Sequence, residues 1–254
     1  MYFDTHAHLD DESFDIDRAE LVASFFEVGV TRILNASSNL KSCNATVALC
    51  DSYDIIYGAV GIHPDSAESF KEADLGVLEA LSKHKKICAI GERGLDYYYD
   101  DVSPELQRKA FEKQAALAYE LKMPVIVHDR DAHRDCFDIL KKFPGINAVF
   151  HCFSGSVEFA CELIRTGYYL SFGGALTFKN ARHAPEVVKS VPRERVMLET
   201  DCPYMAPVPF RGKRNHPGYI PQIAEKVAEL WGTSPEDVGK ITTKNANIFF
   251  RLED

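Results

Sequence analysis

The chain has 254 residues, enough for a hydrophobic core, and we expect one domain over residues 1–254. Its formal net charge of −9 argues against a protein that coats nucleic acid through a broad basic face, because such binding depends on neutralising phosphates. No apolar run is long enough to span a bilayer, and the first residues lack the basic and apolar regions of a secretory signal. We therefore expect a cytoplasmic monomer that does not bind membranes.

Short apolar runs alternate with helical segments along the whole chain. Ser103 followed by Pro104, and Ser234 followed by Pro235, are typical helix starts. The alternation predicts a parallel sheet with right-handed crossovers, and eight such units fit a (β/α)8 TIM barrel. An open doubly wound sheet has a similar periodicity, but no Gly-rich dinucleotide motif follows the first strand. The expected strands lie near residues 2–6, 31–36, 56–62, 87–92, 124–128, 147–151, 168–172 and 195–201.

Polar side chains stand at the carboxyl ends of six of these predicted strands. In a barrel, those ends form the active-site face, so the side chains would converge there. The first two alternate along one strand and therefore point to the same side, where both imidazoles can reach one cation. The residues concerned are His6, His8, His63, Glu92, His128, His151 and Asp201.

Unpaired carboxylates at buried strand ends are costly, so Glu92 and Asp201 indicate a bound cation or a network of donors. A histidine taken singly is as well explained by a hydrogen-bonded core or a solvated surface, and we accept that explanation for three others, His84, His133 and His183. Two carboxylates and four imidazoles exceed the needs of one tetrahedral ion and suit two adjacent metals. We expect Glu92 to bridge them, with His6, His8 and Asp201 on one ion and His128 and His151 on the other.

The mixed nitrogen and oxygen ligands allow Mg, Mn, Zn or Co. Two adjacent metals are typical of phosphoester hydrolysis, in which Asp201 could take a proton from the attacking water. Seven cysteines form no C-x-x-C pair, which argues against a zinc ribbon or a disulfide framework and indicates reduced thiols.

A second group of residues has two explanations that the sequence leaves open. His63 could position a phosphate or act as a hydrogen-bond donor to a ligand. Three arginines, Arg130, Arg211 and Arg214, could contact phosphates or be solvated loop charges. The tyrosines at 97–99 could stack a base, although helix packing explains at least one of them. Glu199 lies two residues before Asp201, and we expect it to orient a ligand imidazole.

Taken together, the motifs resemble those of the TatD family of metal-dependent deoxyribonucleases, within the amidohydrolase-like barrels. The resemblance covers nearly the whole chain, through "FDTHAHLD", "VGIHP", "GERGLDYYYD", "PVIVHDRDA", "HCFSGS", "SFGG", "LETDCPYMAP", "RGKRNHP" and "NANIFF". It implies a TIM barrel that binds two divalent ions and hydrolyses DNA phosphodiesters, commonly as a 3′-to-5′ exonuclease on single strands. By motif, the same six ligands follow from it: His6, His8, Glu92, His128, His151 and Asp201.

Three residues depart from the family pattern: Arg93, Cys202 and His216. None removes a ligand, but Arg93 and His216 are expected in loops that border the mouth, where they would affect substrate preference. The leading hypothesis is thus a nuclease acting on DNA, with RNA open. One alternative is a metal-dependent hydrolase of a small amide, lactone or aminoacyl ester on the same barrel. Another is a non-catalytic protein whose metal has a closed coordination shell.

Overall fold

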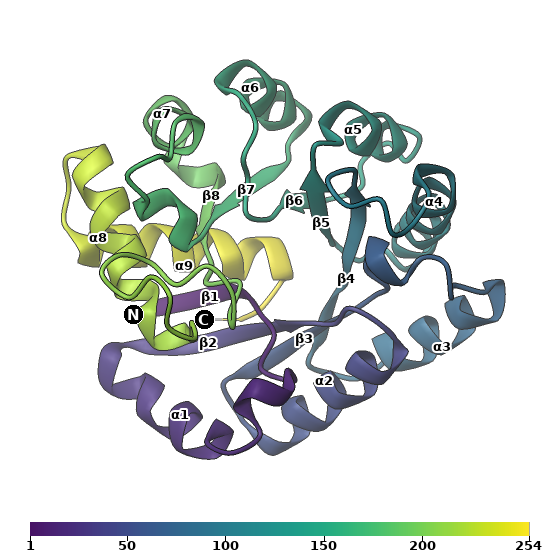
Figure 1. The fold of residues 1–254 in the computed structure, drawn as a ribbon, viewed down its shortest axis with the longest axis horizontal. Helices are drawn as coiled ribbons and strands as arrows, with labels where there is room; N and C mark the ends of the chain where they lie inside the picture. The colour runs from purple at the N-terminus through teal and green to yellow at the C-terminus, as the bar shows by residue number, and fades with distance from the viewer. Residues whose placement is uncertain (254) are drawn as a thin grey trace. The chain divides into compact units, whose positions relative to one another are not determined.

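The computed structural model describes residues 1–253. Its paired strands are parallel and follow one another through one sheet in the order β1 to β8, with a helix after each strand (Figure 1). This confirms the predicted (β/α)8 TIM barrel. The strands are β1 (Tyr2–Ala7), β2 (Val30–Ala36), β3 (Ile56–Val60), β4 (Ile87–Asp96), β5 (Val125–Arg130), β6 (Ala148–Phe150), β7 (Tyr169–Phe172) and β8 (Val196–Leu198).

Serine side chains cap the two helix starts that the sequence predicts. Ser103 accepts a hydrogen bond from the Leu106 amide, and Ser234 accepts one from the Asp237 amide, which confirms both predicted starts. The α-helices are α1 (Arg18–Ser24), α2 (Leu40–Ser52), α3 (Glu72–Ser82), α4 (Pro104–Leu121), α5 (His133–Lys141), α6 (Val157–Thr166), α7 (His183–Ser190), α8 (Ile220–Trp231) and α9 (Pro235–Phe250). Single 3-10 turns are η1 (Glu12–Phe14), η2 (Phe25–Val28), η3 (Pro64–Ser66), η4 (Gly174–Thr177), η5 (Arg193–Arg195) and η6 (Pro217–Tyr219).

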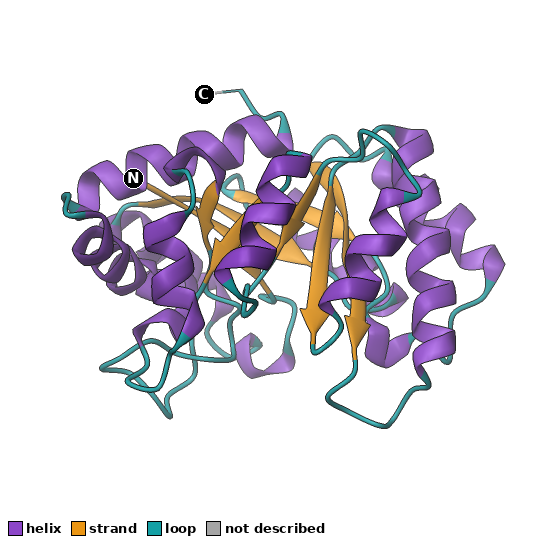
Figure 2. Ribbon diagram, turned by 90° about the horizontal axis from the view of Figure 1, so that it is seen from above, coloured by secondary structure: helices purple, strands orange, loops and turns teal. Residues whose placement is uncertain are grey.

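The chain divides into two compact units. Figure 2 shows the helices in purple and the strands in orange. The first comprises Met1–Asn35 and Cys152–Asp254 and contains β1, β7, β8 and all of β2 except its last residue. The second, Ala36–His151, contains β3 to β6. That residues 1–254 act as one domain stays a prediction.

In the first unit, β1 lies beside β8 although the two strands stand at opposite ends of the sequence. The Thr5 hydroxyl donates to the Leu198 carbonyl at 3.0 Å, and the Asp201 amide donates to the His6 carbonyl at 2.9 Å. Helix α9 packs against both strands, with the Phe3 and Phe250 rings 5.7 Å apart. The carboxyl ends of β1 and β8 are therefore fixed side by side.

In the second unit, β4 is longer than predicted and continues to Asp96. Pairing with β5 extends it, because Arg93, Gly94 and Asp96 lie opposite Val127, His128 and Arg130. This pairing is a tertiary contact, and the residues after Glu92, which include a charged arginine and a glycine, do not predict a strand by themselves.

Arg93 therefore does not lie in a loop at the mouth, and that prediction was wrong. Alternation along β4 turns its side chain away from that of Glu92 and under α4, where it is fully buried. There its guanidinium donates to the Gln114 carbonyl at 2.8 Å and lies 5.8 Å from the centre of the Phe111 ring. Burial lowers the pKa of Arg93 to about 9, so its charge opposes folding.

All seven cysteines lie among the described residues, and none of them is joined to another by a disulfide there. Within residues 1–253, none of the helices combines the length and the apolar character that crossing a membrane requires.

We predict that Arg93→Met leaves the free energy of unfolding unchanged or raises it by about 1 kcal/mol, because it replaces a buried charge with an apolar chain of similar length. Arg93→Ala should instead lower that free energy by about 2–4 kcal/mol, because it also leaves a cavity beside Phe111. Urea unfolding followed by circular dichroism measures both changes. Equal destabilisation by the two substitutions would show that the charge itself stabilises the fold.

Candidate metal centre

In the second unit, three imidazoles surround the carboxylate of Glu92. Glu92 is only 3% exposed, and its Oε1 atom lies 2.8 Å from Nδ1 of His128 and 2.7 Å from Nε2 of His151. Nε2 of His63 lies 3.6 Å from the same oxygen. His63, Glu92 and His128 each offer a donor atom within 4.8 Å of the other two, which is a group that could hold a metal ion. We name these four residues the Glu92 cluster.

Asp96 orients one imidazole of the Glu92 cluster. Its Oδ2 atom lies 3.0 Å from Nε2 of His128, which leaves Nδ1 directed at Glu92. Burial by itself would lower the pKa of His128, but hydrogen bonds to Asp96 and Glu92 outweigh it and raise that pKa. Metal-binding histidines almost always donate their second ring N–H to a carboxylate, a backbone carbonyl or a water molecule, and Asp96 is such a partner.

The sequence analysis missed Asp96, although a signal for it exists. Asp96 lies four residues after Glu92 on the same strand, so alternation directs both carboxylates to one side. Gly94 stands between them, where a Cβ atom would come within 1.9 Å of the His128 carbonyl oxygen. A glycine is therefore required for β4 and β5 to approach each other here.

His63 precedes η3 and reaches the Glu92 cluster from the loop after β3. Its Nδ1 atom accepts a hydrogen bond from the Asp65 amide at 3.2 Å, and the His63 and His128 rings meet edge to face with centroids 4.4 Å apart. The structure thus brings His63 together with two of the predicted ligands.

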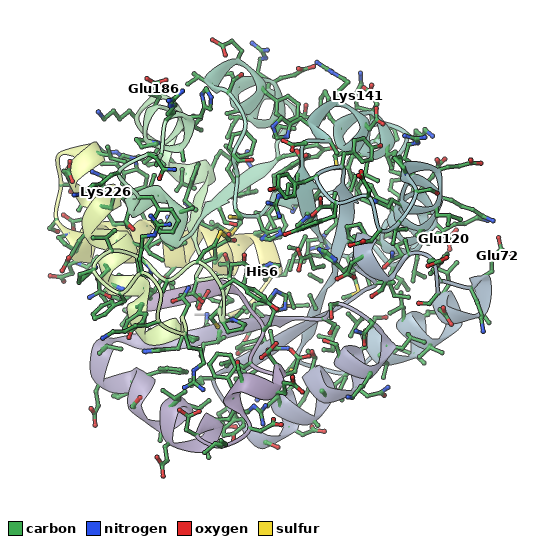
Figure 3. The ribbon with its side chains drawn as sticks, in the orientation of Figure 1. His6, Glu72, Glu120, Lys141, Glu186 and Lys226 are labelled. Carbon is green, nitrogen blue, oxygen red and sulfur yellow. The ribbon has the colours of Figure 1, made fainter. Side chains whose placement is uncertain are left out.

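In the first unit, three predicted ligands meet at the ends of β1 and β8. The Nε2 atoms of His6 and His8 are 3.2 Å apart, and Oδ1 of Asp201 lies 3.8 Å from the first and 3.4 Å from the second. Donor atoms about 2.0–2.1 Å from a tetrahedral ion are about 3.3 Å from one another, so this spacing fits one ion. We name these three residues the Asp201 cluster. Figure 3 labels His6, which is fully buried, and Lys226, which lies on α8.

The backbone at Asp201 departs from ordinary strand geometry. Its φ angle is 55°, which is uncommon for a residue with a side chain, and its amide donates to the His6 carbonyl. Such conformations cost about 1–3 kcal/mol and are concentrated at functional sites. The strained turn directs the Asp201 carboxylate to the two imidazoles.

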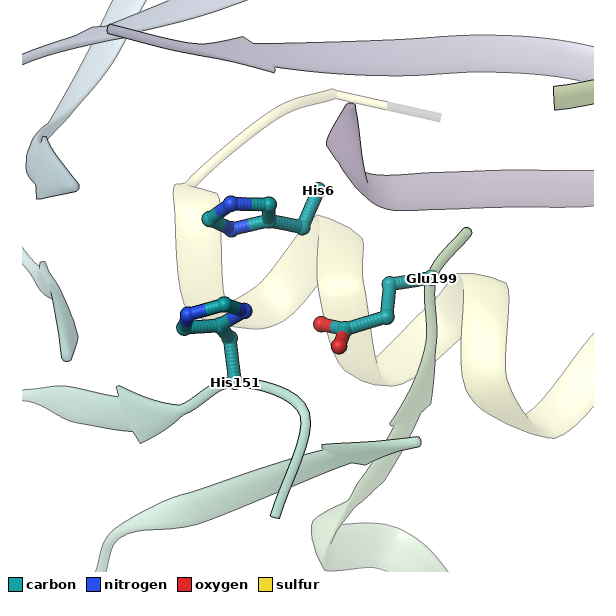
Figure 4. Close-up of side chains that lie close together, drawn as sticks. All are labelled: His6, His151 and Glu199. Carbon is teal, nitrogen blue, oxygen red and sulfur yellow. The ribbon is translucent and has the colours of Figure 1, made fainter. Parts of the chain in front are cut away.

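Two further carboxylates of the first unit are buried beneath this cluster. Asp4 accepts hydrogen bonds from the amide and hydroxyl of Thr200 at 2.9 and 2.5 Å, yet burial raises its pKa to about 7. Glu199 accepts the Cys152 amide at 2.6 Å and the Ser171 hydroxyl. Figure 4 shows the Glu199 carboxylate and the His6 ring of this unit. The role expected of Glu199, to orient a ligand imidazole, stays a prediction. The sequence analysis missed Asp4, although alternation places it on the same side as His6.

The three arginines predicted to contact phosphates differ in the groups that their guanidinium charges meet. Arg214 forms a two-pronged ion pair with Asp17, at 3.0 and 2.5 Å, and also donates to the Ser13 carbonyl, so it fastens its loop to the segment before α1. Arg211 is exposed and lies 4.0 Å from the centre of the Phe178 ring. Arg130 lies over the ring of Tyr98.

Packing accounts for Tyr97 but not for the two tyrosines after it. The Tyr97 hydroxyl donates to Asp135 at 2.6 Å and accepts from Arg108 at 2.9 Å, and burial together with Asp135 raises its pKa to about 12. Tyr98 and Tyr99 are exposed.

The two other departures from the family pattern have packing roles. Cys202 is fully buried, and its carbonyl accepts the His8 amide at 2.9 Å. His216 is half-buried, with its ring centroid 3.9 Å from that of Tyr219 and 6.0 Å from that of Phe25. Burial and the nearby Arg214 lower the pKa of His216 to about 4.

A parallel barrel that carries imidazoles and carboxylates at its strand ends defines the class of metal-dependent hydrolase barrels. The family model described as TatD related DNase matches residues 3–251. The chain therefore belongs to the TatD family, which confirms the resemblance found in the sequence.

Known relatives agree with this assignment over their full lengths. The chain is 43% identical to the uncharacterized metal-dependent hydrolase YabD of Bacillus subtilis, over 99% of this chain and 100% of the relative. It is 33% identical to a protein of Citrobacter rodentium named 3′-5′ ssDNA/RNA exonuclease TatD, over 98% of each chain. Among solved structures, the TatD homolog YJJV of Escherichia coli K12 superposes with a TM-score of 0.93 at 29% identity, over 99% of this chain and 98% of the other.

The low pKa of His216 predicts a specific loss of stability in acid. Because its pKa of about 4 lies below the unfolded value of 6.5, folding favours the neutral ring. The resulting stability is fully present above pH 6.5 and is lost as the pH falls toward 4. We expect His216→Phe, which keeps an aromatic ring beside Tyr219, to reduce this loss in melting temperatures measured from pH 7 to pH 4.

The substitution His183→Gln is the matched control, because His183 is exposed at the start of α7. Its melting profile should follow that of the wild type. Identical profiles for wild type and His216→Phe would contradict the assigned role of His216.

Proposed function

We propose that this chain is a divalent-metal-dependent nuclease that hydrolyses DNA phosphodiester bonds. The observation that carries the proposal is that, in each unit, imidazoles converge on a carboxylate, Glu92 in one and Asp201 in the other. Glu92 lies on β4 and Asp201 follows β8, and the carboxyl ends of the strands form the active-site face of a TIM barrel.

The proposed ligands are divided between two ions. The Asp201 cluster would hold one ion through His6, His8 and Asp201. His128 and His151 would hold the second, with Glu92 as the carboxylate shared by both. Nitrogen and oxygen donors of this kind suit Mg, Mn, Zn or Co.

When bound, two divalent ions would lower the pKa of a water molecule and neutralise charge on the phosphodiester oxygens. The Asp201 carboxylate would accept the proton that the attacking water loses. Asp96 would keep Nδ1 of His128 directed at Glu92, through the 3.0 Å contact at the other ring nitrogen. His63, 3.6 Å from Glu92, would position the phosphate or complete the second ligand set.

The finer specificity that we propose has its support in the name of one relative. The name of the Citrobacter rodentium protein supports 3′-to-5′ action on single-stranded DNA, with RNA as a further substrate. Arg130, Arg211 and Arg214 would contact the nucleic-acid backbone, although Arg214 would first have to release Asp17. A cytoplasmic monomer remains our expectation.

The test is a product ladder from a 5′-labelled single-stranded oligodeoxynucleotide, incubated with the purified protein and Mn²⁺ or Mg²⁺. We expect progressive shortening from the 3′ end, complete inhibition by a chelator, and a fall of about 10²–10⁴-fold in rate for Asp201→Asn, as for loss of a general base. Glu92→Ala should abolish the reaction, because the shared ligand is lost.

Asp138→Asn is the control, because it neutralises an exposed carboxylate on α5 and should leave the rate unchanged. If Asp201→Asn degrades DNA as fast as the wild type, the nuclease assignment is wrong. If the wild type turns over lactones or aminoacyl esters faster than DNA with the same metal, the small-ester hydrolase replaces it.

A further inference from the structure

An arginine in contact with two exposed tyrosine rings lies beside the Glu92 cluster. The Arg130 guanidinium, at the end of β5, lies 3.8 Å from the centre of the Tyr98 ring and 4.9 Å from that of Tyr99. Both rings are more than half exposed, at 57% and 55%. We name these three residues the Arg130 platform.

The platform is fastened to the cluster through one carboxylate. Oδ1 of Asp96 accepts the amides of Tyr98 and Tyr99 at 3.0 and 3.4 Å, while Oδ2 bonds to His128. The Tyr97 amide also donates to the Arg130 carbonyl at 2.9 Å. The rings are therefore exposed on a backbone that is already ordered, so binding a ligand costs them little further entropy.

The charge of Arg130 has no anionic partner in the part of the chain that the structure describes. Its guanidinium forms neither a hydrogen bond nor an ion pair with residues 1–253, and its contacts are the two rings. Arg108 and Arg214, by contrast, are each paired with an aspartate. Contact with the rings uses the π-face attraction of the cation and none of its N–H groups, which can therefore donate to a ligand.

Position along the strand indicates which ligand group would meet these donors. Arg130 follows His128 by two residues, so both side chains leave the same side of β5 with their Cα atoms about 6.6 Å apart. That separation is comparable with the spacing of successive phosphates along a single strand. A planar fork of donors matches the oxygens of a phosphate.

We infer that the Arg130 platform is a subsite for a phosphate next to the scissile one, with an unpaired base of the strand stacked against one of the two tyrosine rings, which stand perpendicular to each other. This inference rests on the proposed nuclease function and specifies how that site would select an oligonucleotide over a smaller phosphodiester. The rings have two roles here: their faces attract the Arg130 cation, and their exposed parts offer a stacking surface for a base.

Binding without catalysis tests the inference directly. Fluorescence anisotropy of a labelled oligothymidylate of eight nucleotides, in a chelating buffer, measures affinity when no metal reaction can occur. Arg130→Gln should weaken binding about tenfold, as expected from losing a charge-assisted hydrogen bond. It should also reduce the slope of log affinity against log salt by about 0.7, the value for one phosphate contact on a single strand.

Further variants separate phosphate contact from a structural role. Arg130→Lys keeps the charge but loses the planar fork, so its affinity should fall between those of the wild type and Arg130→Gln. The double substitution of Tyr98 and Tyr99 by Leu should weaken binding about tenfold or more. Its effect should not add fully to that of Arg130→Gln, because the rings position the guanidinium. Arg165→Gln removes the same charge from an exposed position on α6 and should change neither affinity nor salt slope.

The inference is overturned if Arg130→Gln, with a wild-type melting temperature, binds within twofold of the wild type and keeps its salt slope. It is also overturned if the wild type does not bind the octamer. Failure of the nuclease proposal is a separate result, seen when wild-type protein with Mn²⁺ cleaves neither DNA nor bis(p-nitrophenyl) phosphate. A reduced salt slope for Arg130→Gln would still support the phosphate subsite in that case.

Discussion

The burial of Glu92 within β4, four residues before the end of that strand, is the constraint on which its surroundings depend. A carboxylate that is 3% exposed loses most of its hydration, and leaving it unpaired would cost several kcal/mol. Imidazole nitrogens of His128 and His151 within 2.8 Å compensate part of that cost. Asp201 is in a comparable position between His6 and His8. Because of these pairings, the Glu92 cluster and the Asp201 cluster are each suited to a cation. Their side chains are difficult to replace by apolar ones.

Carboxylates also control how the ligands are presented. Asp96 has two roles, because one of its oxygens fixes His128 while the other holds the amides of Tyr98 and Tyr99. Asp4 similarly fastens Thr200, next to Asp201, to the first strand. The clusters thus depend on residues that would touch neither metal nor substrate, and preorganisation of this kind limits the rearrangement needed on binding.

Local patterns in the sequence predict much of this arrangement, since apolar runs and alternation are local properties. They place the strands within a few residues and set His6 and His8 near the end of β1. They also set Glu92 and His128 at strand ends, whereas β4 continues to Asp96 and β5 to Arg130. Local patterns fail where a contact between distant residues determines the structure. The extension of β4 through Arg93 by pairing with β5 is an example. The partner of Arg214 is Asp17, 197 residues away, and no local pattern shows it. Asp96 could have been found from its alternation with Glu92.

Counting bound ions tests the central claim most directly. Protein stripped with a chelator, equilibrated with Zn²⁺ or Mn²⁺ and freed of excess metal can be analysed by inductively coupled plasma mass spectrometry. The account predicts two ions per wild-type chain, one after His6→Gln with His8→Gln, and one after His128→Gln with His151→Gln. A wild-type chain that retains at most one ion, or that keeps two after either pair of substitutions, would contradict it.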